Sequence, residues 1–100
     1  MIRILKLNPT ENTLIGEYND GDTVMCECDA TTEDFTIVFP DVLSVENATF
    51  KMNRKDEVYA NNITLSVLIP GQKIQNEDTQ ILRVGDSFEI TPGAEHWWVT

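Results

Sequence analysis

The chain has 100 residues and a net charge of −10, which together indicate one small acidic domain. Its hydrophobic fraction of 41% excludes a disordered chain, and no apolar run is long enough to predict a membrane span. The N-terminal residues lack the apolar core and small-residue cleavage site of a secretory signal, so we predict none.

Acidic residues dominate the first half of the chain. No Lys or Arg lies between Leu7 and Phe50. The acids in that interval are Glu11, Glu17, Asp20, Asp22, Glu27, Asp29, Glu33, Asp34, Asp41 and Glu46. Such a surface repels phosphate, so we expect no direct nucleic-acid binding. It is either a solvated face or a docking face for a basic partner.

In chain order, residues 1–23 come first, as N-terminal strands or an arm, and period-two runs follow from Val24 onward. The runs read VMCECD, DFTIVFP, ATFKMNR, NITLSVLI, QILRV, SFEIT and HWWVT. Turn-forming residues separate them, as YNDGD (18–22), RKDE (54–57), ANN (60–62), PG (70–71), NED (76–78) and PG (92–93). This pattern predicts one all-β domain over residues 1–100, a small antiparallel β-sandwich or barrel of about 7–8 short strands without a substantial helix. The segment PDVLSVEN has room for one helical turn.

Alternation also predicts which side chains face the core. The predicted core residues are Phe35, Ile37, Phe39, Phe50, Ile63, Leu65, Val67, Phe88 and Ile90. Cys26 and Cys28 are two apart, so both point inward beside Val24 and are poorly placed to form a disulfide with each other. Two reduced buried thiols suit a protein that folds in a reducing cytoplasm.

The segment GDSFEITPGAEHWWVT ends the chain and raises two interpretations. Gly85, Gly93 and His96 have the spacing of the second motif of cupin metal sites. A cupin site takes further histidines and a glutamate from an earlier motif, and this chain has one histidine. We therefore predict no metal, no cofactor and no catalytic residue, and place His96 near the surface beside a turn.

Two adjacent tryptophans follow that histidine. In a strand they point to opposite faces, so we expect Trp97 to turn inward with Val99 and Trp98 to turn outward. An exposed tryptophan is typical of an interface anchor. The candidate interface residues are accordingly Trp97, Trp98 and His96.

The order and spacing of these segments resemble a β-module of tailed-bacteriophage virion proteins, which include head fibres, capsid decoration proteins and tail-fibre segments. The segments that carry the resemblance are DATTEDFTIVFPDVLSVENATFKMN, NNITLSV, GQKIQN, QILRVGDSFEI and GAEHWWVT, within residues 24–100. Residues 1–23 lie outside it. Asn47 and Asn76 stand where that module has Gly, which predicts left-handed backbone there, and Gln75 replaces its Asp.

The resemblance implies a structural virion protein rather than an enzyme. Because the chain begins with Met and spans one module, we expect a separate gene product, a capsid decoration, cement or head-fibre protein rather than a segment of a long tail fibre. The resemblance and capsid geometry imply a homo-oligomer, a trimer, bound to the major capsid protein or another virion protein. Its location would be the virion, assembled in the host bacterial cytoplasm, with no membrane partner.

Two other functions remain open on the sequence. One is a tail-associated receptor- or carbohydrate-binding module whose exposed aromatic residues stack on sugar. The other is a small metal-dependent enzyme of cupin type, built on His96.

Overall fold

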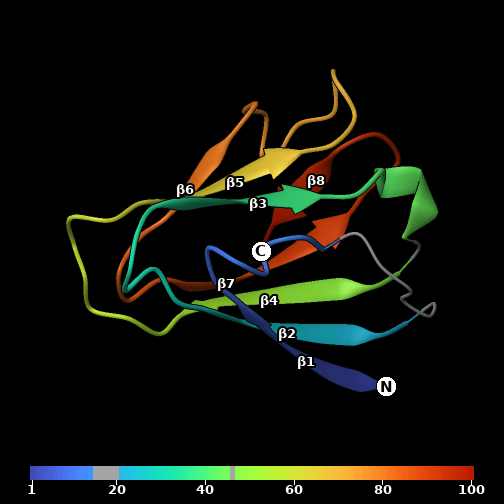
Figure 1. Cartoon of the computed structure of the whole chain (residues 1–100). Helices are drawn as coiled ribbons and strands as arrows, with labels where there is room; N and C mark the ends of the chain where they lie inside the picture. Colours follow the sequence, from blue (N-terminus) through green and yellow to red (C-terminus); the bar gives the residue numbers. More distant parts are fainter. Residues whose placement is uncertain (15–20, 46) are drawn as a thin grey trace.

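A computed structural model describes residues 1–14, 21–45 and 47–100, and these residues form eight β-strands and one 3₁₀ turn (Figure 1). The elements are β1 (Ile2–Leu7), β2 (Thr23–Cys28), β3 (Phe35–Phe39), η1 (Val42–Ser44), β4 (Thr49–Arg54), β5 (Ile63–Val67), β6 (Gln80–Leu82), β7 (Ser87–Pro92) and β8 (Trp97–Val99). Glu17, Asp20 and Glu46 lie outside the described residues, and so do residues 18–20 of the expected turn at 18–22.

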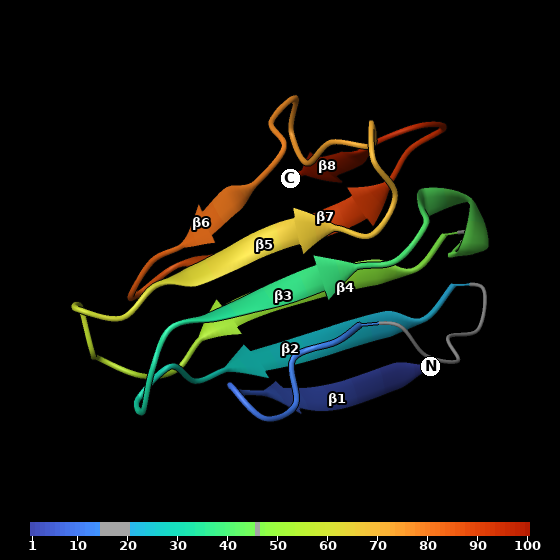
Figure 2. The ribbon, with the colours of Figure 1, turned by 45° about the horizontal axis from the view of Figure 1, so that its top comes forward.

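The strands form two sheets that pack face to face as a sandwich (Figures 1 and 2). One sheet has five strands in the order β1-β2-β4-β7-β8, and the other has three in the order β3-β5-β6. The predicted small β-sandwich without a substantial helix is confirmed. None of the described residues forms a helix long and apolar enough to cross a membrane.

The strand directions correct one part of the prediction, because both sheets are mixed rather than antiparallel. β1 is parallel to β2, β2 to β4, and β3 to β5, while β4 and β7, β5 and β6, and β7 and β8 pair antiparallel. The reason lies in the connections. From β2 to β5 the chain alternates between the sheets, so each strand returns to its own sheet beside a strand of the same direction (Figure 2).

The core lies between the two sheets and contains the predicted inward-facing residues. Seven of the nine are buried, and Val67 and Phe88 are partly buried and pack against them. Cys26 and Cys28 are buried and free, as predicted. Burial raises the pKa of both thiols, that of Cys28 to about 12. The core also takes in residues outside the predicted core set, chiefly Leu14, Met52, Ile74 and Leu82.

Local turn chemistry follows the sequence closely. β3 ends before Pro40, and the expected helical turn is η1. Asn47 and Asn76 adopt positive φ values of 57° and 67°, which confirms the predicted left-handed backbone at both asparagines. Gln75 has a φ of 51°, so two consecutive residues are left-handed there.

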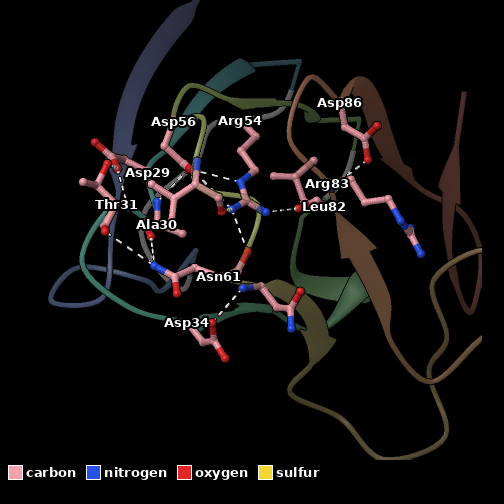
Figure 3. A network of polar contacts seen from close by, with 12 residues as sticks. Asp29, Ala30, Thr31, Asp34, Arg54, Asp56, Asn61, Leu82, Arg83 and Asp86 are labelled. Carbon is pink, nitrogen blue, oxygen red and sulfur yellow. Dashed lines mark hydrogen bonds and ion pairs between the residues drawn. The ribbon is translucent and has the colours of Figure 1, made fainter.

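The sequence places Arg54 both at the end of the run ATFKMNR and at the start of the turn RKDE, and the structure assigns it to the strand. It is the last residue of β4, and it shares the inward face with Phe50 and Met52. Its guanidinium forms an ion pair of 3.1 Å with Asp56, both side chains being almost fully buried (Figure 3). The guanidinium also donates to the backbone oxygens of Leu82, Val58 and Asn61, as Figure 3 shows in part.

Candidate docking surface at the β7–β8 hairpin

The candidate interface residues lie on the hairpin that joins β7 to β8. The amide of Gly93 donates to the carbonyl of His96 at 2.8 Å and closes the turn. The register then places Trp98 opposite Thr91 and Trp97 opposite Pro92. Adjacent residues of β8 therefore point to opposite faces of the five-stranded sheet, as the sequence predicts.

Trp97 turns inward and is fully buried. Its ring meets those of Phe39 and Phe50 edge to face, with centroids 5.2 and 5.6 Å apart. Phe39 belongs to the three-stranded sheet and Phe50 to the five-stranded one, so the indole joins the two layers. Trp97 is thus a core residue that faces inward, as alternation predicts, and its contribution to an interface stays a prediction.

Trp98 turns outward and keeps 37% of its surface exposed. Its ring lies against Gly93: a Cβ on that glycine would stand 2.5 Å from the indole Nε1 and 2.8 Å from Cδ1. Only a residue without a side chain lets the indole rest on the backbone of the turn. The exposed tryptophan is therefore supported from beneath and held in one position.

His96 is half-buried and serves the hairpin as a hydrogen-bond acceptor. The backbone amide of Lys73 donates to its Nδ1 at 3.1 Å. Its ring also meets the Trp98 ring edge to face at 6.3 Å. The structure thus brings together His96 and Trp98, two of the candidate interface residues. The described residues contain no group of three His, Cys, Asp or Glu side chains that could hold a metal ion.

The segment Lys73–Gln75 covers the free edge of β8. The amide of Trp97 donates to the carbonyl of Lys73 at 2.8 Å, and the amide of Gln75 donates to the carbonyl of Trp97 at 2.9 Å. The side chain of Gln75 accepts a further bond from the amide of Val99 at 2.9 Å. These bonds fix the strand that carries both tryptophans and leave its edge occupied.

A shallow groove of about 370 Å³ runs beside the hairpin turn and ends at η1. It is lined by Val42, Leu43, Val45, Asn47, Pro92, Gly93 and Ala94. Leu43 stands out because 69% of its surface is exposed. Gly93 lines this groove with Leu43 and also supports Trp98, so we call the groove and the exposed indole together the hairpin surface.

η1 is held in place by hydrogen bonds from Asp41 and Gln72. The Asp41 carboxylate accepts from the amide of Leu43 at 3.0 Å and from Gln72 Nε2 at 2.8 Å, while Gln72 Oε1 accepts from the amide of Val42 at 3.1 Å. These donors, first the Leu43 amide, lower the pKa of Asp41. The sequence analysis did not identify Leu43 as a site residue. A signal was present, because Val42 and Val45 face inward from one helical turn, and Leu43 between them then faces outward.

A second exposed aromatic residue lies at the other end of the sandwich, on the connection between β4 and β5 (Figures 1 and 2). Tyr59 is 82% exposed and borders a cleft of about 460 Å³. Asn61, Asn62 and Arg83 also line this cleft. The sequence placed turns here but predicted no site.

Comparison of the chain with protein-family models, with curated proteins and with solved structures finds no match.

Proposed function

We propose that this chain is a non-enzymatic structural protein of a tailed-phage virion, a capsid decoration, cement or head-fibre protein that binds the capsid surface as a homo-oligomer. The order and spacing of the segments within residues 24–100 support the virion assignment. The β-sandwich is compatible with it.

The observation that carries the docking role is the hairpin surface. Trp98 is exposed, yet it rests on Gly93, while the neighbouring tryptophan is locked in the core. A pre-positioned indole beside an exposed leucine loses little conformational freedom on binding, which is what an interface anchor requires. The net charge of −10 favours a partner that presents basic residues.

The proposed oligomer is a trimer located on the virion, with the major capsid protein or another virion protein as its partner. Its threefold symmetry rests on the resemblance and on capsid geometry. Many copies on a lattice would reinforce the capsid through avidity even if each contact is weak. We expect neither nucleic acid nor membrane as a direct partner.

The test measures binding of the purified protein to empty heads assembled without it. Trp98→Ala and Leu43→Asp should each weaken binding by at least tenfold, since hot-spot residues carry about 2 kcal/mol or more. Tyr59→Ala is the matched control, because it removes another exposed aromatic residue at the opposite end of the sandwich. Unchanged binding by both hairpin variants would overturn the docking role of this surface.

A carbohydrate- or receptor-binding role on the tail remains the second candidate, and one observation favours it. Tyr59 offers an exposed ring next to the amide groups of Asn61 and Asn62 and the guanidinium of Arg83, a combination suited to stacking and hydrogen bonding with a sugar. Glycan-array binding that is lost in Tyr59→Ala and retained in Trp98→Ala would support this alternative.

A further inference from the structure

β1 is an edge strand whose second side is unpaired within the described residues. It pairs with β2 alone, in parallel. The amide of Thr23 donates to the carbonyl of Met1, and the amide of Asp29 donates to the carbonyl of Leu7, each at 2.9 Å. In a parallel ladder the odd-numbered residues of β1 therefore bond to β2. The amides and carbonyls of Ile2, Ile4 and Lys6 point away from the sheet.

Other sheet edges are covered or short. The amide of Leu14 donates to the carbonyl of Val38 on β3 at 3.4 Å, and Lys73–Gln75 covers β8. β6 has three residues, and its Leu82 carbonyl accepts from Arg54. β1 has six residues, so it offers the longest open row of backbone donors and acceptors in the described chain.

The side chains along this row are apolar and exposed. Ile2 and Ile4 keep 67% and 63% of their surface exposed on the outer face of the five-stranded sheet. The register places Met25 next to Ile4 and Glu27 next to Lys6. The apolar side chains of Ile2, Ile4 and Met25 thus line the edge. Lys6 is the one charged residue on the outward face of β1, and Glu27 lies beside it.

The charge of β1 differs from that of the rest of the chain. It contains Arg3 and Lys6 and no acid, whereas the whole chain carries −10. Arg3 donates to the buried carboxylate of Asp22 at 2.8 Å, which ties this strand to the start of β2. The acids near this edge are Glu27, beside Lys6, and Glu11, which lines a groove with Ile4 and Lys6. Two copies of such an acidic chain repel each other least where basic residues offset the acids, so β1 is the edge at which copies can meet.

We propose that β1 pairs antiparallel with β1 of a second copy, with Ile4 opposite the partner's Ile4. In this twofold register Ile2 lies opposite the partner's Lys6, and every outward amide and carbonyl of Ile2, Ile4 and Lys6 finds a partner. The Ile2, Ile4 and Met25 side chains of both copies then form one apolar cluster across the seam. Lys6 faces an isoleucine of the partner and keeps Glu27 beside it.

This contact goes beyond the proposed function and does not depend on it. It uses the edge of the five-stranded sheet opposite to β8, so the hairpin surface stays free to bind another protein. Alone it gives a dimer. Combined with the proposed threefold contact, it gives a hexamer of three β1–β1 pairs.

Disulfide cross-linking tests both the contact and its register. Cys26 and Cys28 are fully buried, so an introduced cysteine is the reactive thiol. Under mild oxidation Ile4→Cys should cross-link efficiently with itself, since paired Cα atoms lie about 5.5 Å apart. A mixture of the Ile2→Cys and Lys6→Cys variants should cross-link, because these two positions lie opposite each other across the seam. Each of the two variants alone should cross-link poorly. Tyr59→Cys is the exposed control and should stay uncross-linked at the same protein concentration.

Ile4→Pro tests the backbone hydrogen bonds directly. The amide of Ile4 is not bonded to β2, so proline there leaves the internal ladder intact while removing the donor that the partner needs. Native mass spectrometry should show the even-numbered oligomer for the parent chain. Self-association should be roughly 10–100-fold weaker in Ile4→Pro, with the thermal unfolding midpoint nearly kept, because two hydrogen bonds are lost by symmetry.

Two results would overturn the proposal. One is a parent chain that stays at 11.3 kDa or forms only trimers at high micromolar concentration. The other is equal cross-linking of Ile4→Cys and Tyr59→Cys, which would show random collision rather than a specific seam.

Discussion

At the residue scale, Arg54 shows how one buried cation joins distant parts of the chain. Its guanidinium bonds to Asp56 and to the carbonyls of Val58 and Asn61, all in the connection between β4 and β5, and to the carbonyl of Leu82 at the end of β6 (Figure 3). Asp56 in turn accepts from the amides of Ala30 and Val58. A buried charge without an opposite charge beside it destabilises the fold, so Arg54 and Asp56 each require the other. The pair therefore fixes the end of the sandwich where Tyr59 is exposed.

We predict that Asp56 contributes an acid-sensitive part of the stability. Burial opposes its ionisation, but hydrogen bonds from Arg54 and from two backbone amides outweigh that effect and lower its pKa from 3.8 to about 2. A lowered folded-state pKa stabilises the fold above pH 4, and this contribution, about 2 kcal/mol, is lost as the pH falls from 4 through 2. Urea unfolding across this range should show the loss in the parent chain and its absence in Asp56→Asn.

The same substitution should destabilise the protein at pH 7 by roughly 3–5 kcal/mol, since Arg54 would remain buried without an anion. Glu33→Gln is the control, because Glu33 is exposed and its loss should leave the pH dependence unchanged. A pH profile of Asp56→Asn that matches the parent would assign the acid sensitivity to other carboxylates.

At the element scale, the sequence predicted the strands and their inward faces but not their directions. Period-two alternation in FTIVF or TFKMN is the same whether the neighbour runs parallel or antiparallel. Direction depends on which sheet the chain enters after each turn, and no short motif encodes that choice. The outward side chain of Trp98 followed from alternation within β8. The place of Leu43 beside the hairpin turn did not, because η1 reaches that groove from a distant part of the sequence.

We predict that the contact among Phe39, Phe50 and Trp97 contributes a large part of the free energy of unfolding. Phe50, which is fully buried, contacts Phe39 and Trp97 with centroids 5.6 Å away in each case. Phe50→Ala should lower the free energy of unfolding by roughly 3–5 kcal/mol, since the cavity lies between two sheets that cannot both close over it. Phe88→Ala removes a partly buried ring on the adjacent strand and should cost clearly less in the same chemical denaturation experiment. Equal losses would contradict this prediction, because Phe50 would then contribute no more than a partly buried ring outside the aromatic trio.

At the scale of the whole molecule, a small acidic chain is held together by one core that every strand shares. β1 and β2 belong to the same sheet as β7 and β8, so the two ends of the chain stabilise one layer. Cys26 and Cys28 lie on β2 within this core, between β1 and β4, and both are inaccessible in the folded state. Their thiols can therefore report how the molecule opens.

We predict that both thiols become reactive only when the whole domain unfolds. Burial raises the pKa of Cys28 to about 12 and raises that of Cys26 as well, so the folded protein offers almost no thiolate to a labelling reagent. Mass spectrometry should find neither cysteine modified in the native protein and both modified in denaturant. Under native conditions the slow labelling rate should follow the unfolding equilibrium, so Phe50→Ala should raise it by roughly 10²–10³-fold for both thiols together. If the rate did not respond to Phe50→Ala, or if one thiol reacted well before the other, β1 and β2 would be separating locally while the aromatic contact between the sheets stayed closed.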